Sequence, residues 1–279
     1  MRIALLTAAA LVCFAANSIL CRLALAQGAI DPAAFTGLRL ASGALVLALI
    51  ALRRPGTRPA DSWSWLSAAA LFAYAAPFSF AYVSLGAGVG ALVLFAVVQA
   101  TMIGWGVARG DRPRPAVWLG LAIAVGGLVG LTAPGASAPD PLGVGAMAVA
   151  GAAWGIYTLR GRASAIDPVV ANAASFARTV PVAAALVAAA GVTGGLAASP
   201  RGAALAIASG AIASGAGYAL WYAALRGLTV SRAAILQLLV PVVAAAGGVL
   251  LLGETASVRL LAAGGAILGG VALAVSARS

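Results

Sequence analysis

Ten runs of apolar residues divide this chain, and each run is long enough to cross the hydrocarbon core of a bilayer. About 20 residues of α-helix span a core of about 30 Å. Short segments that contain charged residues, glycine or proline separate the runs. The runs cover residues 3–25, 34–52, 63–84, 87–108, 115–133, 142–159, 168–190, 202–225, 231–252 and 257–276. The sequence therefore predicts an all-α polytopic membrane protein with ten transmembrane helices.

The composition supports this prediction. Hydrophobic residues make up 63% of the 279 positions and charged residues only 8%, whereas a soluble domain carries about 25% charged residues. A water-facing surface requires those charges, so most of this chain must face a different solvent. The 35 glycines fit a membrane helix bundle, because small residues let helix backbones approach closely.

The distribution of arginine indicates how the helices are oriented. All 17 basic residues are Arg, and cytoplasmic loops of membrane proteins carry an excess of basic residues. If the N-terminus is cytoplasmic, only Arg201 and Arg259 lie outside, and Arg22, Arg39 and Arg178 lie within helices. The cytoplasmic set is then Arg2, Arg53, Arg54, Arg58, Arg109, Arg112, Arg114, Arg160, Arg162, Arg226, Arg232 and Arg278. We therefore expect both termini in the cytoplasm. We expect no nucleic-acid partner, because the net charge of +11 is spread over the ends of apolar runs.

The first apolar run has a second interpretation as a cleaved signal peptide. Residues 24–26, Ala-Leu-Ala, resemble a small-residue cleavage site. Against this interpretation, the run is long and its basic region is the single residue Arg2. The internal repeat described next also requires this helix, so we expect it to be retained.

The second part of the chain resembles the first. The tetrapeptide Ala-Ile-Asp-Pro occurs at residues 29–32 and again at 165–168, each time just before an apolar run. Two further matches occur, Tyr82–Leu85 with Tyr222–Leu225 and Ala15–Asn17 with Ala152–Trp154. These matches divide the chain into residues 1–135 and 140–279. Each half contains five helices, and because five is an odd number the second half enters the membrane inverted. The sequence thus predicts two inverted five-helix repeats, with a substrate site near the bilayer midplane between them.

Several kinds of chemistry are excluded by the residue types that are absent. The chain has neither His nor Lys, so a lysine Schiff base and a histidine-ligated metal or haem are impossible. Cys13 and Cys21 share one apolar run and are expected to be unpaired. The six carboxylates are predicted at helix ends or in loops: Asp31, Asp61, Asp111, Asp140, Asp167 and Glu254. We therefore expect no catalytic residue, cofactor or metal site. We also expect weak or absent proton coupling, which usually needs a titratable group inside the membrane.

Two arginines, Arg39 and Arg178, are the charges predicted deepest in the membrane, and ionisable residues there are functional candidates. A guanidinium could bind a substrate carboxylate, with two parallel hydrogen bonds. It could instead be structural, bonded to helix-end carbonyls or extended toward the interface. The presence of one in each half favours the structural interpretation.

Aromatic residues recur at helical spacing in the third, sixth and eighth runs. The stripes consist of Tyr74, Phe78 and Tyr82; Trp154 and Tyr157; and Tyr218, Trp221 and Tyr222. Residues three or four apart share a helix face, so each stripe could form one wall of a binding cavity. Aromatic belts at the membrane interface are the alternative. Trp154 and Trp221 lie deeper in their runs and are the better candidates for a cavity that holds a small amphiphilic ligand.

Three amides and one proline complete the set of candidate residues. Asn17, Gln99 and Gln237 lie within apolar runs, where an unpaired polar group is costly. Substrate contact and hydrogen bonding between helices both remain open for each of them. Pro241 interrupts the ninth run and permits a kink, which is a plausible gating element.

These residues resemble the EamA-type branch of the drug/metabolite transporter superfamily. The stretch Gly217–Leu225, then Pro241 and then Leu252-Gly253-Glu254, is similar to the second repeat of that family, and Phe35–Arg39 and Trp154–Tyr157 resemble other parts of it. The first repeat departs from the pattern. Gln99 stands where the family often has proline, and Gly110-Asp111 stands where Gly-Glu is expected.

The resemblance implies ten helices, alternating access and transport of small metabolites, often as export, across the bacterial inner membrane. The aromatic residues look most like those of the family's exporters of aromatic and other neutral amino acids. An exporter of drugs or other metabolites remains the alternative. A phosphate-ester or nucleotide-sugar exchanger would need more basic residues around its cavity. A channel is compatible with the repeat, and a membrane enzyme would need catalytic groups that this chain lacks. We therefore expect a small-molecule substrate and the lipid bilayer as partners.

Overall fold

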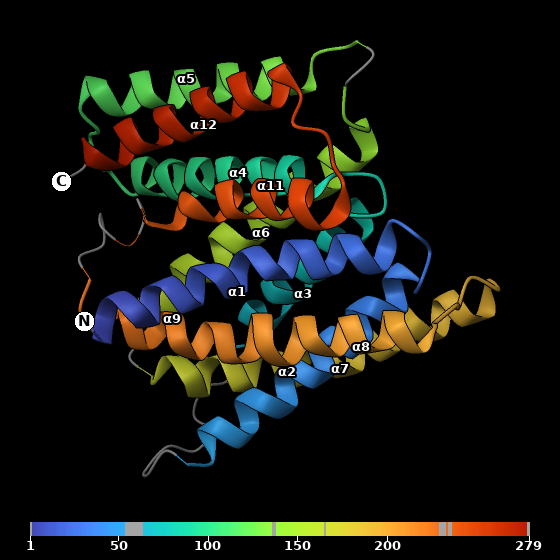
Figure 1. Ribbon diagram of the computed structural model, residues 1–279. Coiled ribbons are helices and arrows are strands. Elements are labelled where there is room, and N and C mark those ends of the chain that lie inside the picture. Colours follow the sequence, from blue (N-terminus) through green and yellow to red (C-terminus); the bar gives the residue numbers. More distant parts are fainter. Residues whose placement is uncertain are drawn as a thin grey trace.

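The computed structural model describes residues 2–53, 64–135, 138–164, 166–228, 233 and 236–277. Within these ranges the chain is helical and forms no strand, apart from one isolated bridge between Ile30 and Ala198. The helices run back and forth across a single bundle (Figure 1). The predicted all-helical class is therefore confirmed.

Ten helical segments make up the described part of the bundle. They are α1 (Arg2–Leu25), α2 (Pro32–Ala51), α3 (Trp65–Ala81), α4 (Ala87–Ala108), α5 (Pro115–Thr132), α6 (Pro141–Ala163), α7 (Pro168–Val192), a continuous segment of α8 (Pro200–Ala208), η2 (Ser209–Ala216) and α9 (Gly217–Leu225), α11 (Leu239–Leu252) and α12 (Val258–Ser276). Eight of these segments are long and apolar enough to cross a membrane, and α3 and α11 are shorter apolar helices.

Aspartate followed by proline sets the start of three helices. Asp31, Asp140 and Asp167 are the N-cap residues of α2, α6 and α7, and proline occupies the first position of each helix. Each carboxylate accepts backbone N–H groups that the helix leaves unsatisfied, and proline suits a position whose N–H has no helical partner. The five carboxylates in the described ranges all lie at helix ends or in turns, as predicted; Asp61 lies outside these ranges.

Three predicted boundaries differ from the structure by more than two residues. The third run was expected to continue to residue 84, but α3 ends at Ala81 and a turn leads to Gly86, the N-cap of α4. The apolar sequence hides this break because no charge interrupts it. The ninth run was expected from residue 231, whereas α11 begins at Leu239; residues 229–232 and 234–235 lie outside the described ranges. The sixth run was expected to end at residue 159, whereas α6 continues to Ala163. The eighth run also contains η2, a stretch of π-helix that apolar periodicity does not predict.

Helices that are distant in the chain form the main packing pairs. These pairs are α5 with α12, α1 with α8–η2–α9, α2 with α8–η2, α2 with α7, α3 with α6, α4 with α6, α1 with α11, and α4 with α11. Small residues permit the closest of these contacts. A Cβ atom on Gly120 of α5 would collide with the Gly270 carbonyl of α12, and a Cβ on Gly270 would collide with the Gly120 carbonyl. The two backbones therefore touch directly, as small residues allow in membrane bundles.

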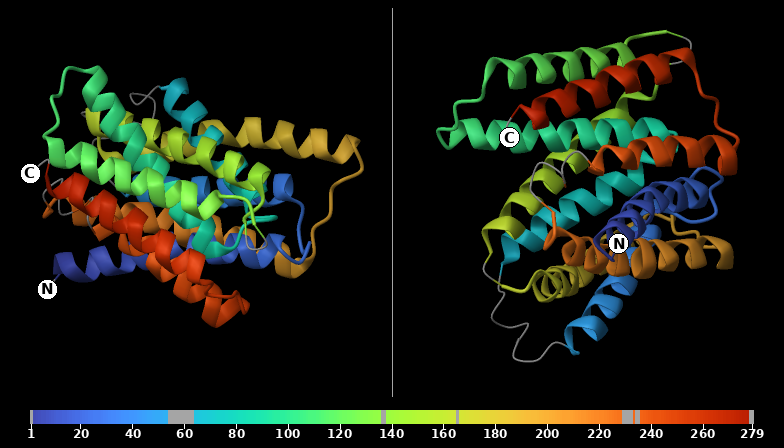
Figure 2. Two further views of the ribbon diagram at one scale, coloured as in Figure 1. Left: turned by 90° about the horizontal axis from the view of Figure 1, so that it is seen from above. Right: turned by 60° about the vertical axis from the view of Figure 1, so that its left-hand side comes forward.

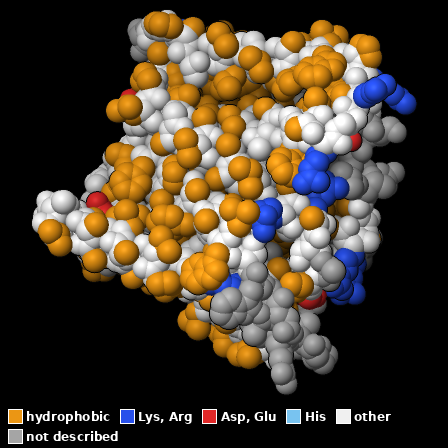
Figure 3. Space-filling model, turned by 180° about the vertical axis from the view of Figure 1, so that it is seen from behind, with side chains coloured by type: hydrophobic (Ala, Val, Ile, Leu, Met, Phe, Trp, Pro, Cys, Tyr) orange, Lys and Arg blue, Asp and Glu red, His pale blue; other side chains and the backbone are white. Residues whose placement is uncertain are grey.

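The two ends of the bundle carry different charges. The first turn of α1 and the last turn of α12 lie at one end (Figure 1), which we call the basic end. Its described arginines are Arg2, Arg53, Arg109, Arg112, Arg114, Arg160, Arg162 and Arg226, with Asp111 and Asp167. The opposite end carries Arg22, Arg201 and Arg259 with Asp31, Asp140 and Glu254. Between the ends the surface is largely hydrophobic, and in the rear view the blue side chains gather toward one edge (Figure 3).

Loops from distant parts of the chain meet at the opposite end. Asp31 N donates to the Ala197 carbonyl at 2.7 Å, and Ser199 N donates to the Ala29 carbonyl at 2.9 Å. These bonds join the α1–α2 loop to the α7–α8 loop, which the views of Figure 2 place side by side. The long α7 is thereby attached to the start of α2 at this end.

Candidate functional site

A buried arginine lies at the centre of the bundle. Arg39 of α2 is 1% exposed. Its Nη2 donates to the Tyr74 hydroxyl oxygen at 2.9 Å, and its Nε donates to Ser214 Oγ at 3.3 Å. The guanidinium also lies 5.1 Å from the centre of the Tyr74 ring and 4.8 Å from that of Phe78. Among the described residues, Arg39 Nη1 has no hydrogen-bond partner.

The π-helical segment η2 brings Ser214 to this arginine and Ser209 to Asn17. A Cβ atom on Gly210 would collide with the Arg39 carbonyl and with Ser42 Oγ, so glycine lets η2 lie directly against α2. Ser209 and Ser214, at either side of Gly210, are both fully buried. Stretches of π-helix are frequent at functional sites because they redirect side chains without ending the helix.

A chain of hydrogen bonds links Arg39 to α1. Ser209 Oγ donates to Asn17 Oδ1 at 2.6 Å, and Asn17 Nδ2 donates to the Tyr74 hydroxyl oxygen at 3.3 Å. Tyr74 thus accepts from both Asn17 and Arg39. Asn17 makes the interhelical hydrogen bonds that were one of its two expected roles, and it also faces a cavity.

This central cavity has a volume of about 30 Å³, which is close to the share of one liquid water molecule. Its wall comes from α1, α3, α4, α6, η2 and α9, and from Gln237. The lining residues are Phe14, Asn17, Ser18, Tyr74, Phe78, Leu94, Phe95, Trp154, Ala213, Tyr218 and Gln237. Both sequence halves therefore contribute to one small interior space, and Arg39 lies behind its lining residues Tyr74 and Phe78.

Aromatic rings form most of the cavity wall. The Trp154 ring lies 4.9 Å from that of Tyr74, 5.2 Å from that of Tyr218 and 5.6 Å from that of Tyr157. Tyr218 also contacts Phe14 at 5.8 Å. Four of the predicted aromatic residues, Tyr74, Phe78, Trp154 and Tyr218, thus meet around one space in the interior.

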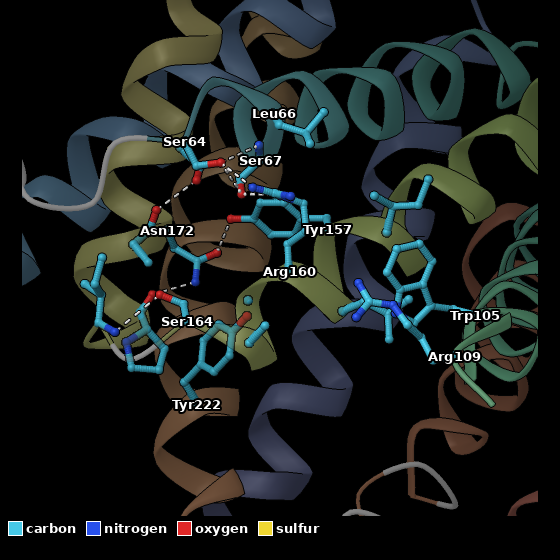
Figure 4. Close-up of a pocket in the computed structure, with 18 residues that line it drawn as sticks. Ser64, Leu66, Ser67, Trp105, Arg109, Tyr157, Arg160, Ser164, Asn172 and Tyr222 are labelled. Atoms are coloured by element: carbon cyan, nitrogen blue, oxygen red, sulfur yellow. Dashed lines mark hydrogen bonds between the residues drawn. The ribbon is translucent and has the colours of Figure 1, made fainter. Parts of the chain in front are cut away.

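A larger vestibule of about 660 Å³ opens at the basic end (Figure 4). Its wall is formed by α3, α4, α6, α7 and α9. Arg160 Nε donates to Ser67 Oγ at 3.1 Å and its Nη2 donates to Ser64 Oγ at 2.8 Å. The Tyr157 hydroxyl donates to Asn172 Oδ1 at 2.7 Å. Hydroxyl, amide and guanidinium groups therefore line this space, and it suits a polar solute.

Two aromatic residues separate the vestibule from the central cavity. Trp154 lines the cavity, whereas Tyr157 lines the vestibule, and their rings are in contact. Tyr222 also lines the vestibule, as does Arg109, whose guanidinium lies 4.8 Å from the Trp105 ring centre. A movement of Trp154 and Tyr157 would connect the two spaces.

Six of the predicted residues line neither space in the described part of the chain: the two deep arginines, Arg39 and Arg178, and also Tyr82, Trp221, Gln99 and Pro241. Tyr82 is fully buried over Gly90, and its hydroxyl donates to the Ala87 carbonyl at 3.4 Å. Trp221 packs against Phe14 with ring centres 5.8 Å apart. Gln99 on α4 and Pro241 on α11 are buried between helices.

The structure also separates the two deep arginines. Arg178 is half-buried on α7, where its Nη1 donates to the Ala174 carbonyl of the same helix and its guanidinium lies 6.0 Å from the Trp65 ring centre. Arg39 follows Asp31 by eight residues, and eight residues after Asp167 comes Ser175. Counted from these helix caps, Arg39 has no arginine counterpart in the second half.

Several lining residues were not singled out from the sequence. Phe14, Ser18, Phe95 and Ala213 line the cavity, and Ser214 holds Arg39. Small residues such as Ala213 and Ser214 occur throughout the apolar runs, so only the π-helical geometry distinguishes them. Phe14 lies three residues before Asn17 on α1, and this i, i+3 spacing is a signal that could have identified it.

Glu254 forms the main charged contact at the opposite end. Its Oε1 and Oε2 accept from Ala87 N at 3.0 and 2.9 Å, so it caps α4 from a distant segment. Arg22 Nε lies 3.5 Å from Glu254 Oε1, and Arg22 Nη1 donates to the Tyr82 and Val83 carbonyls. Gly253 ends α11 with φ +67°, a left-handed conformation that favours glycine, and it turns the chain toward α4.

Comparisons with known proteins complete the description of this site. The model of a protein family described as the EamA-like transporter family matches residues 1–133 and 141–276. An uncharacterized protein of Pseudomonas aeruginosa is 51% identical over 278 residues, which cover 99% of this chain and 96% of that protein. A crystal structure of another protein, 24% identical, has a TM-score of 0.64 and covers 96% of this chain and 98% of its own. At that identity the likeness concerns the fold alone.

Proposed function

The chain belongs to the EamA-like transporter family, and on that premise we propose that it exports small metabolites, with amino acids as the first candidates. The family makes it a multi-pass membrane transporter of small substrates. In our proposal it works by alternating access around the central cavity, and it performs no catalysis.

The proposed architecture is ten transmembrane helices in two inverted repeats, residues 1–135 and 140–279. Two observations support it. The family model matches two segments with nearly these bounds. The packing pairs also keep their pattern when each helix is exchanged with the one five places later. This exchange turns α3–α6 contacts into α1–α9 contacts and α4–α6 contacts into α1–α11 contacts, and it leaves α2–α7 and α5–α12 unchanged.

The proposed orientation places the basic end, with both termini, in the cytoplasm of a bacterial inner membrane. The excess of arginine over carboxylate at that end supports it, since basic residues accumulate on the cytoplasmic side. With this orientation the vestibule opens to the cytoplasm, and the opposite end is closed on the outside. A solute would enter from the cytoplasm, which fits export.

The observation that carries this proposal is the pair of spaces on either side of Trp154 and Tyr157. A vestibule of about 660 Å³ leads from the basic end to these rings, and a small interior cavity of about 30 Å³ lies beyond them. A carrier needs such an interior site that is reached from one side at a time. A channel would require a continuous path through the molecule.

Transport is proposed to run without strong proton coupling. The five described carboxylates cap helices or lie in turns, and none of them lines the central cavity. A proton-driven carrier would need a group that binds and releases a proton close to the substrate. Replacement of each carboxylate by its amide should therefore leave any pH dependence of flux unchanged.

Reconstitution tests the proposal. Liposomes containing the protein and preloaded with labelled neutral amino acids should show saturable efflux and counterflow, with the same rate with and without a pH gradient. Trp154→Ala should reduce the efflux at least about tenfold, because a large aromatic side chain in the cavity wall is lost. Trp118→Ala, on the exposed face of α5, is the matched control. Absence of flux for every amino acid would contradict the substrate assignment, and unsaturable flux would indicate a channel.

A further inference from the structure

The positive charge of Arg39 is not neutralised by the part of the chain that the structure describes. Its hydrogen-bond partners, Tyr74 and Ser214, are neutral, and its other contacts are aromatic faces. Asp31 caps the start of α2. It precedes Arg39 by eight residues, which is about 12 Å along a helix. A buried charge without a counter-ion is costly. An anionic group that binds beside Arg39 would offset this cost.

Two hydrogen-bond donors at this point are unused in the described residues. One is Arg39 Nη1. The residue is 1% exposed, and this nitrogen has no hydrogen-bond partner among the described residues. The other is the hydroxyl hydrogen of Tyr74. Its oxygen already accepts from Arg39 Nη2 and Asn17 Nδ2, so both lone pairs are occupied and the O–H can only donate.

The direction of these bonds is set by the neighbouring serine. Ser209 Oγ donates to Asn17 Oδ1 at 2.6 Å, which turns the amide Nδ2 toward Tyr74. The chain of bonds thus runs from Ser209 through Asn17 to Tyr74 and ends there. Tyr74 lines the central cavity, so its spare donor adjoins the space that a solute would occupy.

Neither the central cavity nor the vestibule has a negatively charged side chain among its described lining residues. The described lining of the central cavity contains aromatic and aliphatic side chains, one serine and two amides, with no carboxylate. Arg109 and Arg160 line the vestibule, again with no carboxylate among its described residues. Positive groups along a confined path attract anions and repel cations. An ammonium group would find no charged partner in either space.

We propose that Arg39 and Tyr74 form a carboxylate-binding point beside the central cavity, so that the solute is a small organic acid whose carboxylate is required and whose amino group is dispensable. The proposal rests on the proposed transport function and narrows its substrate class. The carboxylate oxygens accept from Arg39 Nη1 and the Tyr74 hydroxyl, in charge-assisted hydrogen bonds. The apolar part of the solute extends along the aromatic wall toward Trp154 and the vestibule, and displaces the Trp154–Tyr157 contact.

Three solutes that differ by one group test this proposal in liposomes. L-phenylalanine has both charged groups, 3-phenylpropionate lacks the amine, and L-phenylalaninamide lacks the carboxylate. The two acids should be transported with kcat/KM values within about tenfold of each other, and the amide at least about 30-fold more slowly, after subtraction of flux through protein-free liposomes. Equal transport of amide and acid would overturn the proposal and leave the transport function standing.

Variants of Arg39 and Tyr74 test whether these two side chains cause the preference for acids over the amide. Arg39→Gln should bring the acid-to-amide ratio close to one, Arg39→Lys should keep part of it, and Tyr74→Phe should reduce it about tenfold while the ring stays in place. Arg201→Gln, an exposed arginine at the start of α8, should keep the native ratio. A native ratio in folded Arg39→Gln would contradict the assignment.

Binding to the purified protein separates failure of this proposal from failure of the transport function. Thermal stabilisation in detergent should be produced by L-phenylalanine and 3-phenylpropionate but not by L-phenylalaninamide, and it should be weakened in Arg39→Lys and Tyr74→Phe, which preserve charge or shape. Acid-specific stabilisation supports the binding point even if no flux is found. Stabilisation by the amide that equals that by the acids overturns it.

Discussion

The two ends of the bundle differ in how the helices are held together. At the opposite end, segments from both halves are tied by four sets of contacts: Ser199 and Asp31 between two loops, Glu254 to α4, Arg259 to the Ala133 carbonyl, and the Ser84 hydroxyl to Asp140. At the basic end the described contacts leave a vestibule of about 660 Å³ between α3, α4, α6, α7 and α9. One end is closed by backbone and charged groups, and the other is open.

This difference indicates which contacts a conformational change would have to break. In the proposed inverted repeat the two ends would exchange their packing, so the contacts at the closed end would have to break when the basic end closes. Hydrogen bonds to charged groups contribute about 1.5–3 kcal/mol when buried, and exposed ion pairs contribute about 0–1 kcal/mol. The contacts at the opposite end combine both kinds.

The largest expected effect comes from removal of the Glu254 side chain. In Glu254→Ala, Ala87 N loses its acceptor and Arg22 loses its charged partner, so the opposite end should open more often. With Cys13→Ala and Cys21→Ala in the background, a single cysteine introduced by Ser18→Cys in the central cavity reports this opening. Its reaction with a membrane-impermeant thiol reagent from the opposite side should accelerate about 10–100-fold, which corresponds to about 1.5–3 kcal/mol.

The amide variant is the control for this experiment. Glu254→Gln keeps an oxygen that accepts from Ala87 N but loses the charge that faces Arg22, so its effect should be smaller than that of Glu254→Ala. Equal reactivity of native protein and Glu254→Ala would mean that Glu254 does not hold this end closed.

A smaller effect is expected from the partner, Arg22. Its side chain and that of Glu254 are 21% and 22% exposed, so their ion pair should contribute about 1 kcal/mol or less. Arg22 also donates to the Tyr82 and Val83 carbonyls, which Glu254 does not share. A double-mutant cycle of Arg22→Gln and Glu254→Gln, followed by thermal unfolding, should give a small coupling term. Additive losses would show that Arg22 acts through the carbonyls alone.

The sequence predicted the helix bounds and the arginine distribution, because both depend on local signals. Apolar runs and the Asp-Pro starts of α2, α6 and α7 define most helix bounds to within two residues, because capping depends on adjacent residues. The break after Ala81 was missed by three residues, since an apolar turn carries no charge. The segregation of arginine toward one end also followed from the helix count.

Contacts between distant segments could not be predicted in the same way. Glu254 and Ala87 are 167 residues apart, and nothing in either segment specifies the other. The site shows the same limit. The aromatic stripes identified Tyr74, Phe78, Trp154 and Tyr218, but the π-helix that brings Ser214 to Arg39 lies in a stretch of Gly, Ala, Ile and Ser without a distinct period. The deep position of Arg39 was predicted, whereas its separation from Arg178 depends on a difference of three residues in register.

The basic end provides the contrasting case. Arg160 joins α6 to the start of α3 through Ser64 and Ser67, and its half-exposed position limits its contribution to about 1 kcal/mol or less. Arg160→Ala should therefore change the melting temperature by only a few degrees. Reaction of the cysteine introduced by Ser18→Cys should stay within about twofold from the basic side, because the vestibule is already open and Trp154 and Tyr157, rather than Arg160, lie between it and the cavity that Ser18 lines. A tenfold acceleration would show that Arg160 closes this end and would remove the difference between the two ends.

The smallest effect concerns Asp140, the exposed carboxylate at the closed end. The Ser84 hydroxyl, and then the Gly143 N–H, hold the pKa of Asp140 below its usual value of 3.8. A carboxyl group with a lowered pKa stabilises the fold above its usual pKa, and the contribution is lost as the pH falls through the lowered value. The melting temperature should thus be independent of Asp140 between about pH 5 and pH 8, and it should fall below about pH 4. Ser84→Ala brings the folded pKa closer to the usual value and should make this fall smaller, and Asp140→Asn should remove it. Superimposable pH profiles for native protein and Ser84→Ala would show that the Ser84 contact does not help to close this end.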